Sequence, residues 1–244
     1  MIEFLLLPFV AGLLVLATHV PLGRRVLDRG IVFVDLAVAQ VAGLGALTAH
    51  WLGWDGTIGM QALALAAALA AAGLLTLTER WFDTLQEAVI GVLFVGAASL
   101  ELVLLAFDSH GADHLRDLLV GQVLWVTPAQ LWPLAVLAVA LPLAMRSSAR
   151  SVFYGAFAVC ITASVQVAGL YLVFASLIAP ALGARAFAAR HSLTAGYAIG
   201  ATGYAAGLAA SALTDAPTGP AIVLGLIVSA MAAAIAIRTR PKPR

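Results

Sequence analysis

Long apolar runs dominate this sequence and limit what the chain can fold into. Each run is at least about as long as a helix that crosses a bilayer, for which about 20 apolar residues are needed. The runs span residues 4–22, 31–53, 58–78, 88–107, 125–145, 152–184, 193–213 and 219–237. Charged residues make up only 10% of the chain, against about 25% in soluble domains. The sequence therefore predicts an all-α polytopic membrane protein.

The run at 152–184 is too long for a single crossing. Its 33 residues would form a helix about 50 Å long, which fits a bilayer core of about 30 Å only at a tilt above about 50°. Gln166 and Gly169 lie near the middle of this run. We therefore expect two short crossings, 152–168 and 170–184, shielded from lipid by neighbouring helices. One crossing plus a re-entrant segment is the alternative.

The basic residues predict the orientation of the chain. Nine crossings with the N-terminus outside place twelve of the thirteen basic residues in the cytoplasm, leaving Arg116 outside. Eight crossings would place six basic residues on one side of the membrane and seven on the other. Because cytoplasmic loops are enriched in Lys and Arg, we expect nine crossings and a cytoplasmic C-terminus. No loop is long enough to fold alone, so residues 1–244 are expected to form a single transmembrane domain.

Small residues recur at helical spacing in the run 193–213. Gly196, Gly200, Gly203 and Gly207 form two small-xxx-small steps, which let membrane helices approach closely. The alternative is that these glycines are filler facing the lipid.

Several functional classes are excluded or disfavoured by composition. One cysteine, Cys160, excludes an internal disulfide framework and a Cys-rich zinc site. The single lysine, Lys242, lies between two prolines near the C-terminus, so the chain has no P-loop for ATP. A net charge of +1 argues against nucleic-acid binding. His110 and His114 have the spacing of a zinc-protease pair, but Gly111 replaces the catalytic Glu, so we expect no enzyme.

Polar side chains within the apolar runs are the candidates for a metal path, because ionisable groups in a membrane usually line a wet interior. They are Asp35, Gln40, His50 and Glu101. On a helix, Asp35 and His50 lie within about 60° of each other and about 22 Å apart axially, whereas Gln40 lies about 140° from Asp35. One stripe of this helix thus offers ligands near both ends. The alternative is that Asp35 pairs with Arg24 or Arg29 at the inner interface.

Histidines and carboxylates also gather on the expected outer face. His110, Asp113 and His114 lie in one loop there, and Asp215 follows a later run on the same side. Imidazole and carboxylate are suitable ligands for zinc, manganese or iron(II). The alternative is a loop that is merely solvated.

Five sequence blocks resemble the metal-ion permease family of ABC importers. They are Arg29–Gly45, Gln86–Phe94, Asp117–Thr127, Val167–Ala181 and Asp215–Pro220. Each block is short, but the five occur in the family's order and cover most of the chain. The resemblance implies a homodimeric pore for zinc, manganese or iron in the plasma (inner) membrane. A separate ABC ATPase would drive it, and an extracytoplasmic metal-binding protein would supply it.

The resemblance also implies roles for particular residues. A helix at 184–190, with Arg185, Phe187 and Arg190, would contact the ATPase. His110, Asp113, His114 and Asp215 would receive the metal or dock the binding protein. The divalent ion would be cargo, no cofactor would be bound stably, and ATP would be bound by the partner subunit.

Two features depart from the family pattern. Many members have Asp-x-x-x-His in the second span, whereas here Gln40 takes the His position and the acid lies one residue earlier, at Asp35. The stretch between the fifth and sixth spans also shrinks to Arg146–Arg150. A degenerate copy therefore stays open, as does a secondary transporter without an ATPase. Nine crossings do not divide evenly into the inverted repeats that such transporters often have.

Overall fold

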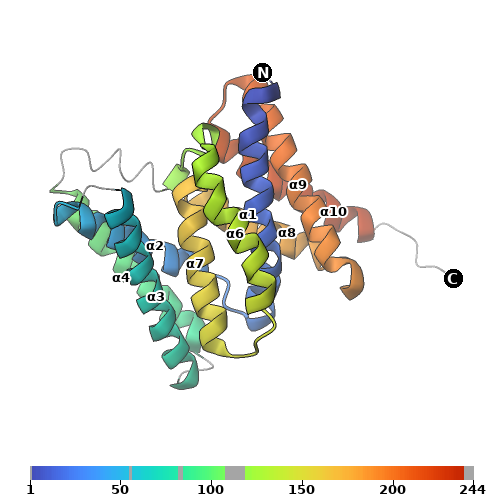
Figure 1. Ribbon diagram of the computed structural model, residues 1–244. Coiled ribbons are helices and arrows are strands. Elements are labelled where there is room, and N and C mark those ends of the chain that lie inside the picture. Colours follow the sequence, from blue (N-terminus) through green and yellow to red (C-terminus); the bar gives the residue numbers. More distant parts are fainter. Residues whose placement is uncertain (1, 55–56, 82–84, 108–118, 239–244) are drawn as a thin grey trace. The chain divides into compact units, whose positions relative to one another are not determined.

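The computed structural model describes residues 2–54, 57–81, 85–107 and 119–238 (Figure 1). Within these residues the regular structure is all helical, with nine α-helices, the 3₁₀ turn η2 and no strand. The helices are α1 (Ile2–Arg29), α2 (Val34–Trp51), α3 (Thr57–Trp81), α4 (Gln86–Leu105), α6 (Pro128–Ala144), α7 (Arg150–Ala168), α8 (Leu170–Ala184), α9 (Ala189–Thr214) and α10 (Thr218–Arg238), and η2 (Val123–Trp125) precedes α6. The predicted all-α class is confirmed for this part of the chain.

Five of these helices are long and apolar enough to cross a membrane. They are Leu5–Arg29, Ile58–Trp81, Gln86–Leu105, Arg150–Ala168 and Thr218–Ile237, while α6 and α8 are apolar but shorter. Every apolar run found in the sequence corresponds to a helix, or to two helices in the case of 152–184. The number of crossings and their orientation stay predictions.

The break expected in the run 152–184 falls at Gly169. Helix α7 ends at Ala168 and α8 begins at Leu170, with Gly169 at φ 74° and ψ 163°. Residues that have a Cβ atom disfavour this positive φ, whereas glycine adopts it readily. The carbonyl of Gly169 then accepts the N–H of Val173 at 3.1 Å, so helical bonding resumes at once. The helix break that we predicted is confirmed.

The helices group into two compact units that alternate along the chain. Unit 1 comprises Met1–Arg29, Val120–Ala138 and Val167–Arg244; unit 2 comprises Gly30–Leu119 and Val139–Gln166. Each unit has its own packing, described in turn below.

In unit 1, the glycines of α9 bring two helices close to it. An ideal Cβ on Gly200 would lie 2.5 Å from Leu16 Cδ2 of α1, and one on Gly196 would lie 2.6 Å from Val20 Cγ1. The earlier glycine of α9 meets the later residue of α1, and the later glycine meets the earlier residue, so the two helices run antiparallel. The backbone of α10 fills the space beside the other two glycines: a Cβ on Gly203 would lie 2.7 Å from Leu226 Cα. The predicted close packing is confirmed, and these glycines do not face lipid.

In unit 2, α2 packs against both α3 and α4. At Gly45 the backbone of α2 approaches α3 so closely that a Cβ would lie 2.7 Å from the carbonyl oxygen of Leu63. Both faces of the first half of α2 are buried, including Asp35 and Gln40. Polar groups in this half are therefore removed from the surface of the unit.

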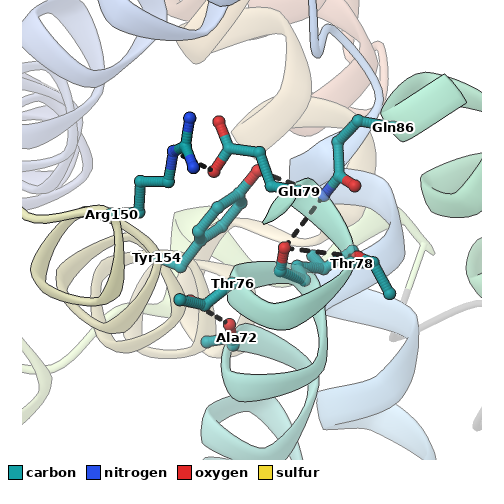
Figure 2. Close-up of polar contacts among 8 residues, drawn as sticks. Ala72, Thr76, Thr78, Glu79, Gln86, Arg150 and Tyr154 are labelled. Carbon is teal, nitrogen blue, oxygen red and sulfur yellow. Dashed lines mark hydrogen bonds and ion pairs between the residues drawn. The ribbon is translucent and has the colours of Figure 1, made fainter. Parts of the chain in front are cut away.

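Polar contacts join α3, α4 and α7 near the start of α4 (Figure 2). The side-chain amide of Gln86 donates to the carbonyl of Leu75 at 3.1 Å and to the hydroxyl of Tyr154 at 3.3 Å. Arg150 Nε lies 3.5 Å from Glu79 Oε2. Gln86 and Tyr154 are both buried. These contacts fix the first turn of α4, which also carries Glu87.

The glycine packing of α9 predicts the effect of a single methyl group. Gly203→Ala places its Cβ against the backbone of Leu226, which cannot rotate away, so the substitution should lower stability by about 1–3 kcal/mol. The matched control is Gly73→Ala in α3, where no atom lies within 4 Å of an ideal Cβ. Thermal unfolding of both variants in detergent gives the comparison. Equal melting temperatures would contradict the close packing.

Candidate functional site

Asp35 is a buried carboxylate in the first turn of α2. Its exposed fraction is 1%, and neither carboxylate oxygen has a hydrogen-bond partner among the described residues. Burying an ionised carboxylate without a partner is costly, so such a group is retained only where something else compensates it. Because neither oxygen is used in a hydrogen bond, Asp35 stays a candidate ligand on a cation path.

Glu87, in the first turn of α4, lies beside the start of α2. Its Oε1 accepts the backbone N–H of Phe33 at 3.3 Å, at the residue before α2 begins. The side chain of Phe33 forms no cap hydrogen bond, and the bond from its backbone N–H to Glu87 ties the start of α2 to α4. Its other oxygen, Oε2, is buried without a hydrogen-bond partner among the described residues.

The sequence interpretation missed Glu87 for a simple reason. It began the fourth span at residue 88, which left Glu87 in a loop, whereas α4 begins at Gln86. The signal that could have found it was its place beside Gln86 in the block Gln86–Phe94, combined with an acid in the first turn of an apolar helix.

Glu101 lies farther along α4 and is also buried. Its exposed fraction is 2%, and its Oε1 has no hydrogen-bond partner among the described residues. Helices α2 and α4 begin beside each other and pack along their length. The fourteen residues from Glu87 to Glu101 span about 21 Å, which reaches the level of Leu47 on α2, about one turn before His50. His50 itself is exposed.

The candidate ligands therefore lie at different levels of unit 2 rather than in one cluster. Asp35 lies near the start of α2, Gln40 is 8% exposed five residues later, and Glu101 and His50 lie toward the far end. In the part of the chain that the structure describes, no three His, Cys, Asp or Glu side chains come together as a metal site. This arrangement suits successive weak sites along a path better than one tight site. The metal path stays a prediction.

Of the predicted outer-face residues, the structure describes only Asp215. It is exposed and follows α9 in the left-handed conformation, with φ 54°. Ser211 closes the turn beside it by bonding the carbonyl of Ala216 at 2.8 Å and the hydroxyl of Thr218 at 2.9 Å. His110, Asp113 and His114 lie outside the described residues.

The helix expected at 184–190 is instead a turn. Helix α8 ends at Ala184 and α9 begins at Ala189, which leaves four residues, too few for a helix of their own. The N–H groups of Arg185 and Phe187 bond carbonyls three residues back, and Ala188 is extended, so the chain reverses between two long helices. Arg185 forms an exposed ion pair with Asp28 at 2.9 Å. Phe187 is half-buried and Arg190 is exposed.

Three glycines from separate sequence blocks meet in unit 1. Gly121 and Gly169 both have positive φ, at 66° and 74°, and their backbones touch so closely that a Cβ on either would overlap the other. A Cβ on Gly219, at the start of α10, would lie 2.8 Å from the carbonyl oxygen of Val120. The break between α7 and α8 is thus covered by protein backbone, which no spacing within the sequence could reveal.

The comparison with protein families rests on nearly the whole chain. The model of the ABC 3 transport family matches residues 1–152 and 144–237. The chain belongs to the ABC 3 transport family. The resemblance to metal-ion permeases of ABC importers is thereby confirmed, and the chain is a membrane-embedded ABC permease. The two matched segments overlap at residues 144–152. This overlap contains the short stretch Arg146–Arg150, at the end of which α7 begins.

Two solved structures share the fold of this permease. PsaBC from Streptococcus pneumoniae in complex with Fab matches with a TM-score of 0.72 and 18% identity, covering 94% of this chain and 90% of the other. An inward-facing conformation of a metal-chelate type ABC transporter matches with a TM-score of 0.67 and 18% identity, covering 96% and 86%. At this identity the matches show a common fold. The shortness of the stretch Arg146–Arg150 therefore leaves the common fold in place.

The unpartnered state of Asp35 predicts the effect of neutralising it. Asp35→Asn keeps the size of the side chain and removes an acid that is costly to ionise where it is buried, so we expect the melting temperature to rise by about 2–4 °C for each kcal/mol gained. Glu79→Gln is the control, because it removes a carboxylate that pairs with Arg150 and should not stabilise the protein. Thermal unfolding at neutral pH checks both. A lower melting temperature for Asp35→Asn would indicate that Asp35 has a partner.

Proposed function

We propose that this permease is the membrane subunit of an ATP-driven importer of divalent transition-metal ions. Two copies would form the pore in the plasma (inner) membrane, a separate ABC ATPase would drive it, and an extracytoplasmic metal-binding protein would deliver the ion. The observation that carries the proposal is the buried Asp35 in α2 of an ABC permease, whose carboxylate has no hydrogen-bond partner among the described residues. A carboxylate in that position is costly unless a cation passes it.

The proposed topology has nine crossings, with the N-terminus outside and the C-terminus in the cytoplasm. It places Glu79 and Arg150 on one side, and Asp28 and Arg185 on that same side. Each of these two ion pairs therefore joins groups that the topology puts at the same interface, which supports it. The contact of Gly121 with Gly169, both assigned to the outer side, agrees as well.

The proposed route for the ion runs between the buried polar residues of unit 2. The ion would enter near His50 and Glu101, pass the level of Gln40 and reach Asp35. Glu101 and Asp35 support this route because both are buried and have carboxylate oxygens without a hydrogen-bond partner among the described residues. His110, Asp113, His114 and Asp215 are proposed to receive the ion or dock the binding protein. The ion is cargo, so it must be released as well as bound.

Transport by the reconstituted complex tests this function. Proteoliposomes with the permease and its ATPase should accumulate Mn²⁺ or Zn²⁺ only when ATP is supplied, because the permease itself has no P-loop. Asp35→Asn should reduce this uptake at least tenfold per folded molecule, with the ATPase still bound. Metal uptake without ATP or the ATPase would instead indicate a secondary transporter. Normal uptake by Asp35→Asn would remove Asp35 from the path.

The turn between α8 and α9 is proposed to contact the ATPase. Exposed Arg185 in the turn and exposed Arg190 in the first turn of α9 lie on either side of Phe187, the one large apolar side chain of the segment. Interfaces commonly have such a polar rim around an apolar anchor. We expect Phe187→Asp to insert normally and to abolish co-purification of the ATPase. Phe187→Leu is the control, since it keeps an apolar anchor and should retain the ATPase. Co-purification unchanged by Phe187→Asp would show that the docking surface lies elsewhere.

A further inference from the structure

We propose that Asp28 is a positioning residue for the ATPase contact: it ties the turn between α8 and α9 to the end of α1 and fixes the direction of Arg185. This rests on the proposed docking of the ATPase at that turn and extends it in two respects. It adds a residue from a helix distant in sequence, and it names α1 as the helix to which movement of the turn is passed.

The turn has one polar side chain with which to hold its place. Arg185 carries polar side-chain atoms, whereas the residues at 186–188 are two alanines and a phenylalanine. Arg185 Nη2 donates to Asp28 Oδ1 at 2.9 Å, across 157 positions of the sequence. Ala188, the residue before α9, forms no side-chain cap hydrogen bond. The contact with Asp28 therefore joins the turn to α1 through the one polar side chain that the turn has.

The helices that lead into the turn are packed closely against α1. At Gly23, α1 approaches the carbonyl of Leu177 in α8 so closely that no Cβ would fit. A Cβ on Gly196 of α9 would lie 2.6 Å from Val20 of α1 and 3.6 Å from Ala184 of α8, so the three helices meet there. Close-packed protein interiors transmit strain rather than absorb it. A displacement of the turn is therefore passed to α1.

Asp28 lies at the level of the turn. It follows Val20 by eight residues, which is about 12 Å along α1, and Ala188 precedes Gly196 by eight residues, about the same length along α9. Helices α1 and α9 run antiparallel and meet at Val20 and Gly196, so these two lengths bring Asp28 and Ala188 to the same level. The contact between Asp28 and Arg185 thus agrees with the packing of the helices.

Arg185 keeps donors for a partner after it has bonded Asp28. A guanidinium has five N–H groups in a rigid plane, and the Arg185 side chain is half exposed. A carboxylate bonded to one edge of this plane fixes the direction in which the other edges point. Asp28 therefore orients Arg185 toward the ATPase without contacting the ATPase itself.

Exposure of the pair separates this role from a role in stability. The side chains of Arg185 and Asp28 are 51% and 70% exposed, and exposed ion pairs contribute little to the stability of a fold. Loss of the pair should change the melting temperature by no more than about 4 °C. The turn and the guanidinium would then move independently of α1, so ATPase binding is the property that we expect to change.

Binding of the fluorescently labelled ATPase to the full-length permease in lipid nanodiscs tests this role. We expect Asp28→Asn to weaken binding about threefold to tenfold, because a turn that is no longer held must be ordered when it docks. Asp28→Glu keeps the carboxylate and should stay within about twofold of the wild type. Glu79→Gln is the matched control: it removes a carboxylate paired with Arg150 and should leave binding unchanged.

A double-mutant cycle shows whether Asp28 acts through Arg185. Arg185→Gln removes the ion-pair partner of Asp28, so adding Asp28→Asn to it should weaken binding no further. An equal loss from Asp28→Asn in both backgrounds would show that Asp28 acts on the ATPase by itself, and no loss in either background would show that it has no role. Each of these results would overturn the proposal, as would a melting temperature that Asp28→Asn lowers by more than about 4 °C.

Phe187→Asp separates this proposal from the proposed docking site. If Phe187→Asp abolishes ATPase binding while Asp28→Asn leaves it unchanged, docking at the turn stands and the role of Asp28 is wrong. If binding survives Phe187→Asp, the docking surface lies elsewhere and the proposal for Asp28 is wrong as well. Loss of binding in both variants, with the loss from Asp28→Asn absent in the Arg185→Gln background, is the result that we expect.

Discussion

The absence of water in the bilayer core is the constraint on which this structure depends. Backbone N–H and C=O groups must bond within the protein, so helices are the way for this chain to span, and irregular backbone must be covered. Gly169 illustrates both points: it interrupts a helical run, and the backbone of Gly121 lies directly against it. The same constraint makes each buried charge costly, which is why Asp35, Glu87 and Glu101 carry information about function.

Close packing of helices follows from the same environment. Because lipid tails are as apolar as the helices, association depends on van der Waals contact, and small residues allow the closest approach. Helix α9 uses its glycines in two pairs, Gly196 and Gly200 toward α1 and Gly203 and Gly207 toward α10. The spacing predicted the packing but could not tell which neighbour each pair would meet, since that depends on contacts distant in sequence.

Apolar length predicted the helices well because one physical quantity, the bilayer thickness, sets it. It located the break at Gly169 and every helical segment, but it was less accurate at helix ends. The fourth span was begun two residues late, so Glu87 was missed, and a four-residue turn was taken for a helix at 184–190. The pairing of Glu87 with the start of α2 and the meeting of Gly121 with Gly169 are non-local, so no periodicity could show them.

The position of Asp35 and Glu87 at helix starts bears on how this protein tolerates acids within its helices. The N-terminal turn of a helix carries partial positive charge, which stabilises a nearby anion. Asp35 and Glu87 each lie in such a turn, so part of the cost of burying them is met by α2 and α4 themselves. On the proposed route, a cation at Asp35 would gain correspondingly less than it would from an uncompensated acid. Such a site would bind the ion weakly enough to release it, as transport requires.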